Sequence, residues 1–469
     1  MNIYDLDKRG NMPIYEYLYN CIKKDILSGH LEPEQRLLSK RTMSKIYDIA
    51  VITVENAYAQ LLVEGYIYGK QRSGYYVSDI AARLIDLPAP SVLEDFSSYE
   101  ATDKPQDSDI IDLSAGALQR DAFPFASWAK LSRKILLDEE KNLLSAPHPQ
   151  GVYALRRSIC NYLSSAKGLY VKPDNIIVGP GSEYLHQIII QLIGKSCIVA
   201  TEDPGYKKVS QIYSASGVRC LHIPVDHKGL VVSELSRHPI RLVHTSPAHH
   251  FPTGRIMTID RRYELINWAR ESDSYIIEDD YDSEFRLSGR PIPTLASLSQ
   301  SHTIYMNTFT RSMAPAIRIA YIVLPDRLID IYRQKLSFYS GTVSAFDQYI
   351  LSAFMDNGYF ERHISRMRTF YRKLRNDIIG AFNESGISKY AALEEEHAGL
   401  HFILRITSDI NDETFIDKLS EYGIALRSIK EYCHYPNDAY NHCFIVNYGT
   451  MNIENFKKAL NIIKEILDK

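Results

Sequence analysis

The stretch Ser274-Tyr-Ile-Ile-Glu-Asp-Asp-Tyr-Asp-Ser-Glu-Phe-Arg286 begins as a short apolar run and ends in a cluster of acidic residues. An apolar run of this length, bounded by polar residues, is typical of a strand that is buried on both faces. Similar runs, separated by longer stretches with helical spacing, occur at residues 175–179, 196–201, 241–245 and 303–307. Strands that alternate with helices in this way predict an α/β fold with a largely parallel sheet covered on both faces.

Chemically distinctive residues follow several of these runs, and ligands of such sheets bind beyond the carboxyl ends of the strands. Asp279 comes directly after the strand predicted at residues 274–278, and Tyr281 points the same way as Asp279 if the chain stays extended. Gly179-Pro-Gly-Ser182 precedes a helix, so its backbone amides and serine hydroxyl suit a phosphate. Tyr206 follows another strand and could stack on a flat ring. Each feature also has a purely structural interpretation, as an acidic surface turn, an ordinary strand-to-helix turn or a packed aromatic.

The composition is that of a cytoplasmic globular protein with two or three domains. The chain has 469 residues, of which 45% are hydrophobic, and a net charge of −3, so no global charge favours nucleic acid or membrane. Its six cysteines are scattered, as in a reduced cytosolic protein. No apolar run approaches the roughly 20 residues that span a bilayer. The pair His249-His250 has no carboxylate or cysteine at ligand spacing, so we expect no metal site.

The N-terminal segment has a separate pattern of three helices and a hairpin. Helical spacing runs over residues 12–27 and 50–64, and Ser39 stands where an N-cap would begin the helix between them. Two β-rich runs flank a polar turn in residues 66–77. This is the outline of a winged helix-turn-helix, a DNA-binding fold. Residues 1–77 hold ten basic and nine acidic side chains, so DNA contact must come from a local surface.

A boundary between domains is predicted in residues 88–109, which hold three prolines, six acidic residues and one lysine. Such a composition is typical of a solvated linker. We therefore predict a multidomain protein with a winged helix in residues 1–78, a linker in 79–109 and an α/β unit in 110–469. Within the α/β unit, a small α+β subdomain is expected from about residue 380, with strands at 399–405 and 444–448.

Several longer motifs together resemble the MocR/GabR family of bacterial regulators, and the resemblance runs from Pro13 to the C-terminus. The motifs are LLSKR (37–41), TVENAYAQL (53–61), QGVYALRRSI (150–159), EDPGY (202–206), HHFPTGR (249–255), IIEDDYDSEFR (276–286) and the segment 305–321. Members of this family join a GntR-type winged helix to a domain similar to fold-type I aminotransferases, which use pyridoxal phosphate (PLP). The resemblance implies a homodimeric transcription regulator that binds DNA and a small-molecule effector, for example an amino acid or a B6 vitamer.

The resemblance also implies roles for residues of the predicted pocket. Asp279 would pair with the pyridine nitrogen of PLP, and Tyr281 would contact its phenolic oxygen. Tyr206 would stack on the ring, whereas Ser182 and Arg318 would hold the phosphate.

Arg311 is the main departure from the family pattern, because it stands where a lysine would form the Schiff base with PLP. A guanidinium stays protonated and is a poor nucleophile. No lysine lies close in the sequence, and the nearest downstream is Lys335. Three outcomes remain open: PLP binds non-covalently, Arg311 clamps a ligand carboxylate or phosphate, or the pocket is only structural.

We therefore predict a regulator whose aminotransferase-like domain senses PLP or a related effector without turnover. The alternatives are a working PLP enzyme with an accessory N-terminal domain, and a degenerate regulator that binds no cofactor.

The resemblance implies DNA contacts as well, with one departure in the recognition helix. The family has a Ser-Arg pair before the threonine of this helix, whereas this chain has Val51 and Ile52 before Thr53. An arginine that would reach bases or phosphates is therefore missing, and we expect weaker or differently specific DNA binding. A winged helix retained for dimerisation or protein contact is the alternative. The implied DNA-contacting residues are Lys40, Arg41, Thr53, Lys70, Arg72 and Gly74.

Overall fold

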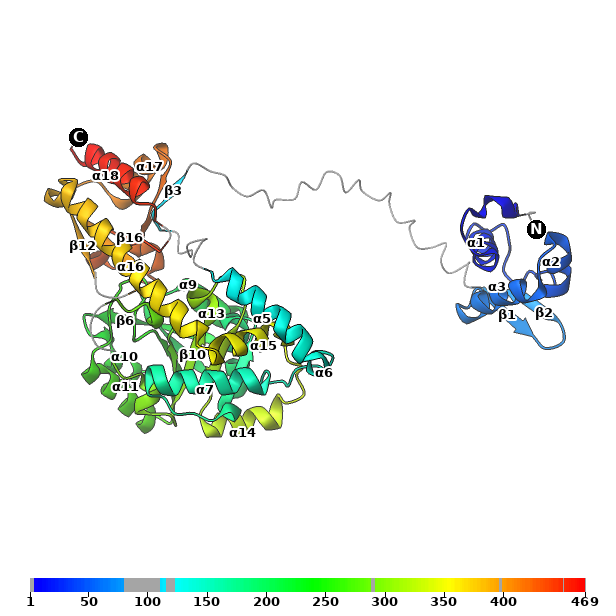
Figure 1. Ribbon diagram of the computed structural model, residues 1–469, viewed down its shortest axis with the longest axis horizontal. Helices are drawn as coiled ribbons and strands as arrows, with labels where there is room; N and C mark the ends of the chain where they lie inside the picture. Colours follow the sequence, from blue (N-terminus) through cyan, green and yellow to red (C-terminus); the bar gives the residue numbers. More distant parts are fainter. Residues whose placement is uncertain are drawn as a thin grey trace. The chain divides into compact units, whose positions relative to one another are not determined.

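The computed structural model describes residues 4–79, 110–114, 123–287, 292–395, 399–449 and 451–468. The chain divides into two compact units, Met1–Asp107 and Ser108–Lys469, which are both drawn in Figure 1. The predicted linker, residues 79–109, lies outside the described residues except for its first residue. In the described ranges, no helix combines the length and apolar character needed to cross a membrane.

The N-terminal unit is a winged helix, as predicted. After a short 3-10 helix η1 (Leu6–Arg9), its elements are α1 (Ile14–Leu27), α2 (Lys40–Tyr47), α3 (Val51–Val63), β1 (Ile67–Lys70) and β2 (Gly74–Val77). The side-chain oxygen of Ser39 accepts a hydrogen bond of 3.1 Å from the Thr42 N–H, so Ser39 caps α2. The buried side chains of Leu18, Val54 and Leu61 join the helices in one core.

The larger unit is built on an eight-stranded sheet in the order β4-β11-β10-β9-β8-β5-β6-β7. The five predicted strands are confirmed, and β5, β8, β9 and β10 pair in parallel. Strand β11 is antiparallel to both of its neighbours, which the apolar pattern did not predict. The strands are β4 (Ile176–Gly179), β5 (Ile198–Asp203), β6 (Arg219–Asp226), β7 (Gly229–Leu230), β8 (Ile240–Thr245), β9 (Tyr275–Asp279), β10 (Thr303–Thr308) and β11 (Ala320–Val323).

Helices cover both faces of this sheet, because alternate strand residues point to opposite sides. Ile277 packs in the core beneath α8 (Ser182–Ile193), α9 (Lys207–Ala215) and α14 (Asp326–Lys335). Its neighbour Ile276 packs in the core of the opposite face. The other helices of the large sheet region are α5 (Phe125–Asp138), α6 (Glu140–Leu143), α7 (Tyr153–Lys167), α10 (Val232–Leu235), α11 (Ile259–Glu271), α12 (Leu295–Leu298), α13 (Phe309–Ser312) and α15 (Ala345–Asp356).

A smaller four-stranded antiparallel sheet forms the C-terminal part, in the order β12-β13-β16-β15. The long helix α16 (Tyr359–Glu384) contacts α15 at the large sheet and α18 beside the small one (Figure 1). The short strand β3 (Ile111–Asp112) also joins this region by pairing in parallel with β14 (Ile424–Ala425). The remaining elements are β12 (Ala391–Glu394), β13 (His401–Ile406), α17 (Asp412–Glu421), β15 (Arg427–Ser428), β16 (Cys443–Asn447) and α18 (Ile453–Leu467).

The two sheets meet closely at Gly399 and His249. Gly399 has a φ of +69°, and a Cβ atom added to it would lie 1.6 Å from Cε1 of His249. His249 cannot withdraw easily, because it is buried and its Nδ1 lies 2.8 Å from the Asp282 carboxylate. Only glycine fits this contact.

We expect Gly399→Ala to lower the free energy of unfolding by about 2–4 kcal/mol, through overpacking and the left-handed backbone. Gly380→Ala is the matched control, because a Cβ there meets nothing within 4 Å in the middle of α16, so it should be neutral or stabilising by up to about 1 kcal/mol. Urea denaturation followed by far-UV circular dichroism measures both. Equal stability of the two variants would contradict the close contact.

Candidate ligand-binding and DNA-binding sites

One pocket of about 440 Å³ lies at the carboxyl ends of the parallel strands, as expected for a sheet of this type. Thr201 of β5, His244 of β8, Asp279 of β9 and Asn307 of β10 reach it from four strand ends. The starts of α8 and α9 form another part of its wall. The structure brings all the predicted ligand residues together here, namely Ser182, Tyr206, Asp279, Tyr281, Arg311 and Arg318.

A histidine from the neighbouring strand lies beside the carboxylate of Asp279. Nε2 of His244 lies 3.3 Å from Oδ2 of Asp279. Behind it, the ring centroid of His186 is 5.3 Å from that of His244, and Nδ1 of His186 lies 3.0 Å from the Tyr213 hydroxyl. Burial lowers the pKa of His186 to about 3, so this imidazole is neutral. The arrangement presents an oriented carboxylate that suits a protonated ring nitrogen.

Tyr281 lies deeper in the pocket and keeps its phenolic proton. Burial raises its pKa well above the usual range, although the charge of Arg311 acts in the opposite direction. The Tyr281 hydroxyl lies 3.2 Å from Nδ1 of His249. Arg311 stands on α13, immediately after β10, and lines the same pocket. The uncharged phenol of Tyr281 and the positively charged guanidinium of Arg311 therefore interact electrostatically in the same pocket.

The opposite end of the pocket is built around a glycine turn. Gly181 has a φ of +109° and precedes Ser182, the first residue of α8. A Cβ on Gly181 would lie 2.5 Å from Nη2 of Arg318, so the glycine lets the guanidinium approach the start of the helix. Glu183 and Lys208 also line this end. Two cations and a helix start are features that bind anions.

Two lysines line the pocket although none is near Arg311 in the sequence. Lys207 and Lys208 come from the first turn of α9. Sequence distance from Arg311 gave no indication that these two lysines line the same pocket. Lys208 forms an ion pair with Glu183 at the anion end.

The C-terminal part of the chain also supplies pocket residues that the sequence did not identify. Tyr432, Cys433 and His434 line the wall opposite the large sheet. The ring of His434 stacks on that of His222, with centroids 3.7 Å apart. The backbone N–H of His434 donates to the Asp203 carboxylate over 2.8 Å, which fixes this wall to the end of β5. Only a pairing of distant segments, and no local motif, could have indicated these residues.

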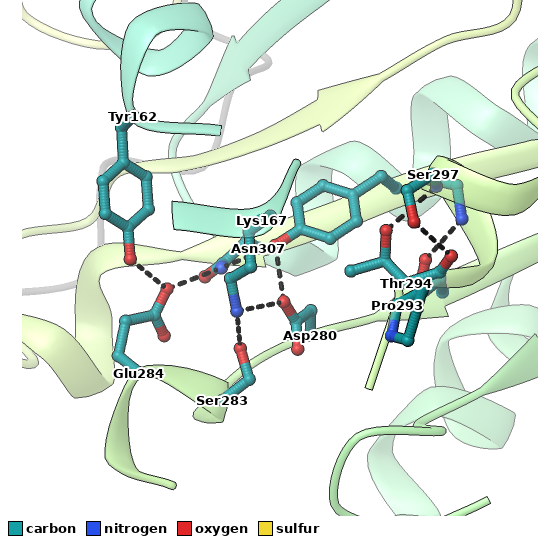
Figure 2. A network of polar contacts seen from close by, with 12 residues as sticks. Tyr162, Lys167, Asp280, Ser283, Glu284, Pro293, Thr294, Ser297 and Asn307 are labelled. Carbon is teal, nitrogen blue, oxygen red and sulfur yellow. Dashed lines mark hydrogen bonds and ion pairs between the residues drawn. The ribbon is translucent and has the colours of Figure 1, made fainter. Parts of the chain in front are cut away.

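A buried network of charges lies on the other face of the strand that carries Asp279 (Figure 2). Nζ of Lys167 lies 2.9 Å from Oδ2 of Asp280, and the side-chain amide of Asn307 donates to Glu284 over 3.0 Å. Burial opposes both charges of the ion pair, but mutual attraction raises the pKa of Lys167 and lowers that of Asp280. Because Asn307 also lines the ligand pocket, the network and the pocket share a side chain. Tyr162, Ser283 and Tyr305 complete it.

The predicted DNA-contacting residues lie on α2, α3 and the hairpin of the winged helix. Two of the lysines are paired with acidic side chains: Lys40 lies 2.6 Å from Glu55, and Lys70 lies 3.1 Å from Glu34. Arg41 and Arg72 are exposed, and so is Gly74 at the start of β2. Thr53 lies in the first turn of α3, directly after the exposed side chains of Val51 and Ile52.

Comparisons with known proteins agree with both halves of this structure. Residues 14–77 match the gntR family of bacterial regulatory proteins, and residues 108–463 match the aminotransferase class I and II family. The HTH-type transcriptional regulator YdeL of Bacillus subtilis, which is uncharacterized, is 35% identical over 92% of each chain. The probable rhizopine catabolism regulatory protein MocR of Rhizobium meliloti is 28% identical, over 98% of this chain and 94% of its own. The chain belongs to the MocR family of transcriptional regulators.

The aminotransferase-like fold of this MocR-type regulator is also found among solved enzymes. An archaeal alanine:glyoxylate aminotransferase superposes with a TM-score of 0.68 at 21% identity, over 77% of this chain and 91% of that chain. The likeness establishes the fold of the larger unit. The predicted family and fold class are thus confirmed for the MocR-type chain, whereas the roles of individual pocket residues stay predictions.

The neutral His186 behind the pocket of this MocR-type chain makes stability depend on pH. Its folded-state pKa of about 3 lies below the value of roughly 6.5 for an unfolded chain. Below pH 6.5 the unfolded chain therefore takes up a proton that the folded protein does not, and the free energy of unfolding falls by about 2 kcal/mol by pH 5.

Between pH 7.5 and pH 5, we expect the free energy of unfolding of His186→Gln to fall by about 2 kcal/mol less than that of the wild type. His238→Gln, at an exposed histidine, should behave like the wild type. Urea denaturation at the two pH values measures the difference. An identical loss in His186→Gln and the wild type would contradict a neutral buried imidazole.

Proposed function

We propose that this chain is a cytoplasmic, homodimeric DNA-binding regulator whose larger unit binds PLP or a related B6-type effector non-covalently and does not turn it over. The observation that carries the proposal is that Asp279, Tyr281, Tyr206 and Arg318 share one pocket in which Arg311 takes the place of the lysine. Large exposed apolar side chains of the larger unit support self-association, and they include Phe125, Leu137, Leu144 and Phe338.

Apart from Glu183 beside Arg318, the residues of the pocket fit the polar groups of PLP. Asp279, supported by His244, would hold the ring nitrogen, and Tyr281 would contact the phenolic oxygen. Tyr206, which is half exposed at the pocket wall, would cover the ring, and Arg318 with Ser182 would hold the phosphate. When bound in enzymes, PLP supplies an electron sink for carbanions. Here Arg311 cannot supply the neutral amine that covalent attachment requires.

Three other functions are testable. Arg311 could clamp a ligand carboxylate, because a guanidinium binds carboxylates in a bidentate manner, and the effector would then be an amino acid. A working PLP enzyme is favoured only by Lys207 and Lys208, which line the same pocket. A regulator that binds no cofactor would show no response to PLP.

For the DNA-binding half, we propose that Val51 and Ile52 contact thymine methyl groups. Both lie in the first turn of the second helix of the helix-turn-helix, and their side chains are 42% and 60% exposed. The N-terminal residues of such recognition helices meet base edges in the major groove, where apolar side chains contact the thymine methyl. Arg41 and Arg72 are exposed and would contact phosphates. This accounts for a recognition helix without basic residues.

The covalent alternative is tested by borohydride reduction in the presence of PLP, followed by peptide mass spectrometry. We expect no PLP–lysine adduct in the wild type, and an adduct at position 311 in Arg311→Lys, since the rest of the pocket is retained. Arg333→Lys, at an exposed position on α14, adds a lysine outside the pocket and should give none. A stoichiometric adduct of the wild type at Lys207 or Lys208 would overturn the proposal.

The contact with thymine is tested by replacing thymine with uracil in the footprinted operator, which removes only the methyl groups. We expect the affinity of the wild type to fall by about 5-fold or more, because each base contact contributes about 1–3 kcal/mol. Ile52→Ser should respond less to the replacement. Val63→Ser is the control, because Val63 is exposed at the other end of α3. Equal wild-type affinity for both operators would refute this contact.

A further inference from the structure

The anion end of the ligand pocket already contains a negatively charged side chain. Glu183, the second residue of α8, extends its carboxylate between two cations. Oε2 of Glu183 lies 3.0 Å from Nη2 of Arg318, and Oε1 accepts a hydrogen bond from Nζ of Lys208. Each oxygen of the carboxylate is therefore engaged by one of the two cations that line this end.

The carboxylate lies against the turn that would receive a ligand phosphate. A Cβ atom on Gly181 would lie 2.5 Å from Nη2 of Arg318 and 2.7 Å from Oε2 of Glu183. The glycine, the guanidinium and the carboxylate are thus packed together at the start of the helix. A phosphate that approached Arg318 from this helix start would meet Glu183 in the same space or at contact distance.

Glu183 stays ionised at neutral pH. Partial burial opposes its charge, but the hydrogen bond from Lys208 and the positive charge of Arg318 lower its pKa to about 2. Glu183 is therefore not neutralised by protonation, and its negative charge repels a second anion. Two cations next to a dianionic phosphate would balance, whereas with Glu183 present the same two cations face three negative charges.

We propose that the negative charge of Glu183 determines which class of ligand this pocket binds. The pocket favours a B6-type ring without a phosphate ester, such as pyridoxal, over PLP. This inference rests on the proposed function, because it assumes that a B6-type ring occupies the pocket. Like charges at contact distance repel strongly when partly shielded from water. A ligand without phosphate leaves the pairs of Glu183 with Arg318 and Lys208 intact, whereas PLP must displace the carboxylate or share its cations.

The experiment measures the dissociation constants of pyridoxal and PLP by isothermal titration calorimetry at pH 7.5 and fixed ionic strength. Glu183→Gln keeps the shape of the side chain and removes its charge. Glu421→Gln is the control, at an exposed position on α17 that does not line the pocket. We expect the wild type and Glu421→Gln to bind pyridoxal at least as tightly as PLP. Glu183→Gln should bind PLP at least 10-fold more tightly than the wild type does, with less than a 2-fold change for pyridoxal.

Two results would overturn the inference while leaving the proposed function intact. One is a wild type that binds PLP more than 10-fold more tightly than pyridoxal, and the other is an equal shift of both affinities in Glu183→Gln. If neither ligand binds any variant, the proposed function fails, and inorganic phosphate observed by ³¹P NMR then tests Glu183 alone. Tighter phosphate binding by Glu183→Gln than by the wild type supports the role of Glu183, and unchanged binding overturns it.

Discussion

The buried ion pair between Lys167 and Asp280 holds the strand end on which the ligand pocket is built. Successive residues beyond β9 point to opposite faces, so Asp279 and Tyr281 reach the pocket while Asp280 points to the network behind it. Removing one partner of such a pair leaves an uncompensated buried charge and costs about 3–5 kcal/mol. The side chain of Asn307 takes part in this network and also lines the ligand pocket. The position of the Asp279 carboxylate thus depends on charges that lie outside the ligand pocket.

Much of the fold could be predicted from the sequence, because its strands are short, apolar and separated by helices. The winged helix was also predictable, since its caps and turns are local. The antiparallel orientation of β11 was not predicted, because an antiparallel strand inside the sheet has the same apolar character as a parallel one. The pairing of β3 with β14 was missed because it joins residues more than 300 positions apart, at Ile111 and Ile424, and has no local signal.

Only part of the candidate site could be predicted from the sequence, for a similar reason. Residues that directly follow strands, such as Asp279 and Tyr281, could be assigned to one edge of the sheet. Lys208 and Glu183 could not be paired, because ion pairs between separate helices depend on packing. His434 belongs to the C-terminal part and reaches the pocket only through the fold. Sequence distance from Arg311 was therefore a poor guide to which cations share its surroundings.

Three charge changes distinguish this chain from a PLP-dependent DNA-binding enzyme. Arg311 stands where the family resemblance implies a reactive lysine amine, and Glu183 lies beside Arg318, for which we propose a role in holding a ligand phosphate. In the winged helix, the first turn of α3 presents Val51 and Ile52 without a basic residue. Each change preserves the fold, since the affected side chains lie at the pocket wall or on the surface. Together they support the proposal of a regulator that binds its ligand without chemical turnover.

Native mass spectrometry of the protein with PLP and with pyridoxal tests this central claim most directly. A non-covalent complex carries the full mass of the ligand, whereas a Schiff base is lighter by one water molecule. The account predicts a complex at full ligand mass that dissociates completely under denaturing conditions. A complex lighter by one water, or the absence of any complex with either ligand, would contradict it.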